Sequence, residues 1–174
     1  SEIEGEAGGL LATQDITGNT GGVVSSLGIV SSYDNRDNIF FPTEGTLVEL
    51  AVMNSSSKLG SDFDFTRISL DASAYFTNKW NHTFAVNGWF NFIYGDPPFN
   101  ELALIGGTKK MRGFYEGRYR DKKLWMLQSE YRMPELYWRL GLVVFGSVGS
   151  VAPTVSDFAT SKVHYSVGSG LRIL

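Results

Sequence analysis

Apolar and polar residues alternate with a period of two along most of this chain. Between residues 67 and 76 every even-numbered position is apolar, whereas most odd-numbered positions are polar. Residues 82–94 and 163–173 repeat the pattern. Successive side chains of a β-strand point to opposite faces, so this period predicts strands with one apolar and one polar face. No stretch has a helical period of useful length.

The alternation predicts eight strands, at residues 23–33, 45–54, 67–76, 82–94, 98–106, 122–133, 137–149 and 162–174. Strands that follow one another in sequence are usually neighbours in the sheet, so the simplest topology is antiparallel and up-and-down. Residues 1–22 read as a polar, glycine-rich lead-in, and residues 23–174 as one β domain. A long connection over 107–121 interrupts the domain.

Strand length separates a membrane barrel from a soluble sandwich. Several predicted strands run to about ten to thirteen residues, close to the length that a tilted strand needs to cross a bilayer and longer than most strands of soluble proteins. Aromatic residues gather near strand ends, as in interfacial girdles: Phe40, Phe41, Trp80, Tyr94, Trp125, Tyr137 and Trp138. An antiparallel transmembrane β-barrel is therefore expected, with a soluble all-β sandwich as the alternative.

The face opposite the apolar one carries the candidate lumen residues of such a barrel. These are Arg67, Asp71, Asn87, Asn91, Gln128, Glu130, Arg132, Arg139 and Arg172. Inward carboxylates such as Asp71 and Glu130 are expected to pair with arginines such as Arg67 and Arg132, because an unpaired charge in a confined space is costly.

Composition narrows the function classes. The net charge of −3 and pI of about 5.4 argue against nucleic-acid binding. The absence of cysteine excludes disulfides and thiolate metal sites. The sequence contains no run of eighteen apolar residues, so no transmembrane helix is predicted. Its N-terminal residues do not have the pattern of a signal peptide. Neither histidine has a catalytic companion or zinc spacing, so no enzyme, cofactor or metal site is predicted.

The connection from Gly106 to Gly117 reads Gly-Gly-Thr-Lys-Lys-Met-Arg-Gly-Phe-Tyr-Glu-Gly. A simple hairpin turn needs far fewer residues, and a loop of this length usually has a function or is disordered. Seven of the fifteen Lys and Arg residues lie between positions 109 and 123. This cluster could bind nucleic acid or the phosphates of lipopolysaccharide, although a solvated loop is the expectation that we favour.

A second polar segment, Asp34 to Gly45, contains oxygen ligands suited to calcium. Asp, Asn, Pro and Gly are also the ordinary residues of turns. We favour the turn.

Five ordered segments resemble the C-terminal barrel of the bacterial surface-antigen superfamily, which includes the BamA and TamA assembly factors, FhaC-type secretion transporters and barrels fused to patatin-like lipases. The segments are residues 33–45, 106–114, 129–132, 144–149 and 168–172. The resemblance implies a barrel in the bacterial outer membrane. It also implies partners: outer-membrane lipid including lipopolysaccharide, client proteins, and periplasmic domains upstream.

The resemblance further implies a role for the loop. In the family, an Arg-Gly-Phe tip, here Arg112, Gly113 and Phe114, folds back into the lumen, where its arginine binds acidic residues. Glu130 matches one acidic partner. The family's second partner is the aspartate of Phe-x-Asp-x-Gly, where this chain has Ser147. Hydroxyls carry no charge, so Arg112 is expected to depend more on Glu130.

Family barrels continue with further strands after the Gly-Leu-Arg segment and usually follow periplasmic repeats. The chain is therefore expected to be a fragment of a larger barrel or a short member. Three functions stay open: a barrel that inserts or exports client proteins, a barrel that anchors or exports a fused enzyme such as a patatin-like lipase, and a soluble carbohydrate-binding module.

Overall fold

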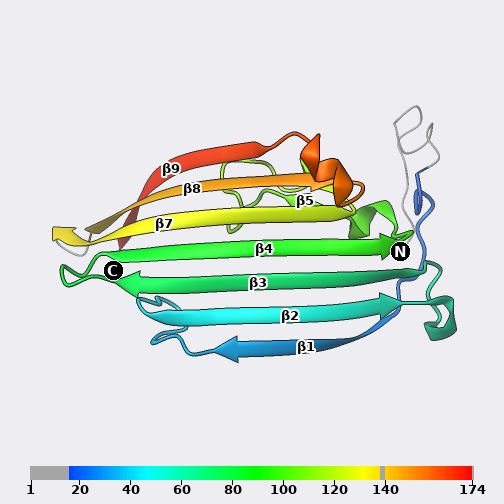
Figure 1. Cartoon of the computed structure of the whole chain (residues 1–174), viewed down its shortest axis with the longest axis horizontal. Helices are drawn as coiled ribbons and strands as arrows, with labels where there is room; N and C mark the ends of the chain where they lie inside the picture. The colour runs from blue at the N-terminus through cyan, green and yellow to red at the C-terminus, as the bar shows by residue number, and fades with distance from the viewer. Residues whose placement is uncertain (1–15, 138–139, 174) are drawn as a thin grey trace.

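The computed structural model describes residues 16–137 and 140–173 (Figure 1). The long strands are β1 (Ser26–Asp34), β2 (Gly45–Ser55), β3 (Phe65–Thr77), β4 (Thr83–Gly95), β7 (Lys123–Tyr137), β8 (Leu140–Ala152) and β9 (His164–Ile173). The short elements are β5 (Ala103–Ile105), β6 (Tyr119–Asp121) and the 3-10 helices η1 (Ser57–Leu59), η2 (Phe99–Glu101) and η3 (Ser156–Ala159). Within the described part, no helix is long and apolar enough to cross a membrane.

The seven long strands form one antiparallel sheet in the order β1-β2-β3-β4-β7-β8-β9. Figure 1 shows them side by side, with neighbours running in opposite directions. Within the described residues, β1 pairs only with β2 and β9 only with β8, so this part of the sheet is open. The expected all-β, antiparallel up-and-down architecture is confirmed.

One predicted strand is wrong. Residues 98–106 do not join the large sheet: η2 and β5 occupy them, and β5 pairs with β6 in a separate two-stranded sheet. Pro97 precedes this segment and Pro98 begins it, and neither has an N–H to give to a ladder. The Phe99 N–H donates to the carbonyl of Thr17 instead. The bounds of the long strands also shift by one to four residues: β1, for example, begins at Ser26, β7 extends to Tyr137, and β8 runs from Leu140 to Ala152.

The β5–β6 hairpin lies against β7 and β8 and defines the inner face of the sheet. The core is between the hairpin, its loop and this face. Its buried members are Phe65, Ile93, Ala103, Ile105, Met111, Leu124 and Met126. The sheet thus buries apolar side chains where the loop covers it.

The outer face is apolar and exposed, as the alternation predicted. Its exposed members include Val48, Leu50, Val52, Ile68, Phe84, Leu127, Val144, Tyr165, Val167 and Leu171. The register aligns several of them across strands: Leu50 lies opposite Leu70, and Leu70 opposite Phe90. A continuous apolar surface of this kind requires a lipid or protein covering.

Candidate functional site

The loop between β5 and β6 closes on itself at its base. The Gly107 N–H donates to the carbonyl of Phe114 at 3.1 Å, and the Gly117 N–H donates to the carbonyl of Ile105 at 3.1 Å. Gly106 has a φ of 114°, and a Cβ there would lie 2.3 Å from the Tyr115 carbonyl oxygen. Only glycine fits this close approach, so Gly106 determines where the two ends of the loop can meet.

Met111 lies at the loop tip in a left-handed conformation, with a φ of 53°. That conformation is uncommon for a residue other than glycine. Its side chain is fully buried in the core, and its N–H donates to Gln128 Oε1 at 3.2 Å. Gln128 Nε2 in turn donates to the carbonyl of Lys109 at 3.3 Å. Burial and these bonds offset the cost of the bend, and the residues on either side of Met111 contact different strands.

Arg112 contacts β7 and β8. Its Nη2 donates to Glu130 Oε2, and its Cζ lies 3.7 Å from the centroid of the Phe145 ring. Its Nε is buried and has no hydrogen-bond partner among the described residues. Arg132 Nε donates to the other oxygen, Glu130 Oε1, at 2.6 Å. One carboxylate on β7 therefore holds a cation from the loop and a cation from its own strand, in charge-assisted hydrogen bonds.

Lys110 contacts β3 and β4 on the other side of the tip. Its Nζ lies 2.5 Å from Asp71 Oδ2 and 3.8 Å from the centroid of the Trp89 ring. The predicted pairing of Asp71 with an arginine such as Arg67 is wrong. Arg67 binds the side chain of Glu101 at 2.6 Å instead. The loop brings a lysine to Asp71, and η2, between β4 and β5, brings Glu101 to Arg67.

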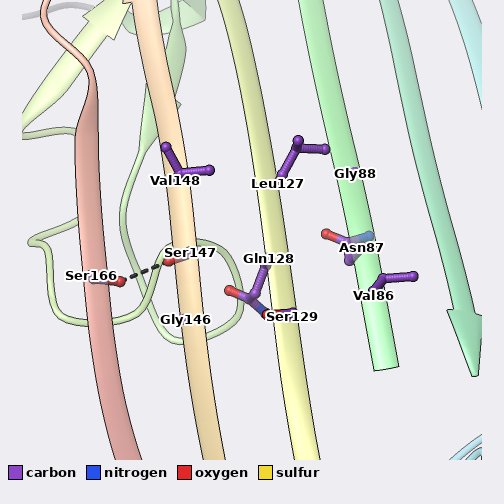
Figure 2. A pocket seen from close by; sticks show the side chains of 10 residues that line it. All are labelled: Val86, Asn87, Gly88, Leu127, Gln128, Ser129, Gly146, Ser147, Val148 and Ser166. Carbon is purple, nitrogen blue, oxygen red and sulfur yellow. Dashed lines mark hydrogen bonds between the residues drawn. The ribbon is translucent and has the colours of Figure 1, made fainter. Parts of the chain in front are cut away.

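Ser147 does not reach Arg112 through a described hydrogen bond. Its hydroxyl lies 2.7 Å from the hydroxyl of Ser166 on β9 (Figure 2). Figure 2 also shows the loop passing behind these strands. A Cβ on Gly113 would lie 3.7 Å from Ser166 Cβ, so the loop backbone runs close to this pair. On β8 it is Phe145, two residues earlier, that contacts the guanidinium.

Phe114 links the loop to β9 through an aromatic cluster. Its ring centroid lies 5.7 Å from that of Tyr119 and 6.0 Å from that of His164. Tyr119 and His164 stack with their centroids 3.7 Å apart. Sequence reasoning gave His164 no role. The sequence does hold one indication of its position: His164 is a large side chain on the same strand face as the small residues Ser166, Gly168 and Gly170.

The remaining predicted lumen residues are distributed along the same face. Arg132 also donates through Nη1 to the carbonyl of Pro42 at 3.0 Å. Arg172 lies with its Cζ 5.5 Å from the centroid of Phe41. Arg139 lies outside the described residues. The inner face thus brings Arg112, Glu130 and Arg132 into one cluster and places Arg67 and Asp71 in separate ion pairs.

The segment between β1 and β2 is built as a turn. Arg36 pairs with Asp34 at 2.7 Å, and Asp37 accepts hydrogen bonds from the Thr43 hydroxyl at 2.6 Å and from the Thr43 and Glu44 N–H groups. These bonds, the Thr43 hydroxyl first, lower the pKa of Asp37 to about 2. The acidic oxygens are occupied by groups of the turn itself.

Comparison with known proteins places these features in a family. The model of the Omp85 superfamily domain matches residues 20–174. A solved structure, BamA from Haemophilus ducreyi lacking POTRA domains 1-3, is similar with a TM-score of 0.71 and 18% identity. The match covers 84% of this chain and 35% of that one, so the chain spans about a third of the BamA structure. The resemblance found in the sequence is confirmed, and the chain belongs to the Omp85 superfamily.

Proposed function

We propose that this chain forms part of a bacterial outer-membrane barrel that inserts or exports client proteins, with the loop from Gly106 to Gly117 docked in its lumen. Membership of the Omp85 superfamily and the likeness to BamA support this assignment. The proposed partners are outer-membrane lipid, including lipopolysaccharide, client proteins, and periplasmic domains. The role requires no catalysis and no cofactor.

The observation that carries the proposal is the distribution of polarity across the sheet. Charged residues such as Asp71, Glu130 and Arg132 lie on the inner face, where they pair, while the outer face exposes side chains such as Leu50 and Ile68. A barrel in lipid requires an apolar exterior and accepts a polar interior. The outer face of a soluble carbohydrate-binding module would be in water and would have to be polar. The apolar outer face therefore disfavours that alternative.

The docked loop supports a gated lumen. Its tip carries two cations, and each is paired with a carboxylate of the wall. A guanidinium in a confined lumen is stable only when it is paired, because water there is limited. In the proposed role, this loop controls which part of the lumen is open to a client.

Reconstitution of the full-length protein in liposomes tests the proposal. A urea-denatured outer-membrane barrel protein is added, and its folding is followed by protease protection. We expect faster folding than with empty liposomes of the same lipid. Membrane insertion without any acceleration would favour an anchor for a fused enzyme, and a monomer soluble without detergent would contradict the membrane assignment.

A further inference from the structure

An acidic pair lies on the inner face of β2 and β3. Glu49 and Asp71 are register partners on these adjacent strands and therefore share a face. Like charges directly opposite one another destabilise a sheet. Asn87 Nδ2 donates to Asp71 Oδ1 at 2.6 Å and orients that carboxylate, but an amide supplies no charge. A cation bound here therefore offsets the repulsion between the two carboxylates.

Lys110 supplies that cation from the loop. Its Nζ lies 2.5 Å from Asp71 Oδ2 and 3.8 Å above the ring of Trp89, so an anion and an aromatic face both bind the ammonium. Its side chain is 27% exposed and that of Asp71 is 29% exposed. The pair is thus shielded enough from solvent to hold a defined geometry.

The loop is bound by two carboxylates, Asp71 on β3 and Glu130 on β7, which differ in the number of cations they bind. Glu130 on β7 binds Arg132 as well as Arg112, so the loop shares this carboxylate with a cation of the sheet. Asp71 makes its described ion pair with Lys110. We infer that Lys110 is a second positioning residue, which fastens the loop to β3 independently of Arg112 and compensates for the uncharged Ser147. This inference rests on the docked loop of the proposed function, not on client insertion.

Cysteine labelling of the loop tip tests the inference. Met111 is fully buried at the loop tip, and residues 1–174 contain no cysteine; any cysteine elsewhere in the full-length protein is replaced by serine. In the full-length protein carrying Met111→Cys as its reporter, the rate of maleimide labelling therefore measures how often the tip leaves the wall. We expect Lys110→Met, which keeps an unbranched apolar side chain and removes the ammonium from Asp71 and Trp89, to raise this rate on the order of tenfold, as the loss of a charge-assisted hydrogen bond predicts.

The matched control is Lys109→Met. Lys109 is exposed, and its described contact with Gln128 uses only the backbone carbonyl, so the labelling rate should match that of the parent. Lys110→Arg should keep the rate close to the parent's, because the charge is retained. Asp71→Asn should raise the rate as Lys110→Met does, and combining the two should add little.

Three results would overturn the inference: parental labelling in Lys110→Met and Asp71→Asn, additive effects of the two changes, or an equal increase in Lys109→Met. Asp71→Asn provides a second test if Lys110→Met does not fold. The liposome assay is independent of this readout. Parental labelling with intact client folding overturns only the role of Lys110, whereas increased labelling without client folding overturns only the proposed function.

Discussion

The ring of Phe145 lies beneath the guanidinium of Arg112, with 3.7 Å between the ring centroid and Cζ. Through this contact β8 binds the loop, although Ser147 on the same strand carries no charge. An aromatic face attracts a cation through its quadrupole, and the attraction contributes about 0.5–2 kcal/mol according to how far the pair is desolvated.

Phe145→Leu should weaken loop docking by about this amount, since leucine fills most of the space and has no π-face. The change is measured from the labelling rate of Met111→Cys in the full-length protein. Phe84→Leu is the control, because Phe84 is 43% exposed on the outer face. Equal labelling rates in Phe145→Leu and the parent would contradict a contribution from this contact.

Met111→Ala should lower the free energy of unfolding by about 2–5 kcal/mol, the usual cost of removing a buried methionine side chain. The lower end is expected, since a loop can relax around the cavity. Urea unfolding of the full-length protein in detergent measures the loss. Met53→Ala is the matched control, because Met53 is 41% exposed and should cost much less. An equal loss at both sites would refute the burial of the loop tip as a source of stability.

Leu70→Lys should destabilise the protein in a bilayer by roughly 2–4 kcal/mol, because Leu70 lies in the outer row between Leu50 and Phe90. Ser69→Lys, on the opposite face of the same strand, should be tolerated far better. Unfolding titrations in lipid bilayers provide the comparison. If both lysines were tolerated equally, the outer face would be in water and the membrane assignment would fail.

Asp37 should titrate with a pKa of about 2, held low first by the Thr43 hydroxyl and then by backbone N–H groups. Because the folded pKa lies below the ordinary value near 4, the contribution of Asp37 to stability is complete above about pH 4. It is lost as the pH falls through the folded pKa. The carboxyl carbon chemical shift of Asp37, followed by NMR as the pH is lowered, measures this. A midpoint near 4 would show that the turn is not formed as described.

The alternation of apolar and polar residues was sufficient to predict which side chains lie on each face of the sheet. A period of two assigned Asp71 and Glu130 to the inner face and Leu70 to the outer face, because register leaves no other choice once one face is apolar. The pairing of Arg112 with Glu130 was expected from the family resemblance, and the structure places the two side chains in contact.

Other features depend on tertiary structure that local patterns do not encode. Residues 98–106 alternate well enough to resemble a long strand of the main sheet, yet they form η2 and the short strand β5, which pairs with β6. Lys109 and Lys110 are adjacent and chemically identical, and only the folded loop shows that Lys110 binds Asp71 while Lys109 is exposed. The contact of Phe145 with the loop likewise depends on how the loop lies across β8.

The most direct test of the account is a double-mutant cycle on Arg112 and Glu130 in the full-length protein. Arg112→Ala, Glu130→Ala and the double variant are compared by their free energies of unfolding in lipid or detergent. The account predicts a coupling energy of about 1–2 kcal/mol, within the range for residues that share an ion-pair network and modest because Arg132 also binds Glu130. Additive losses would contradict it, since they would mean that the loop tip is not bound to the wall through this pair.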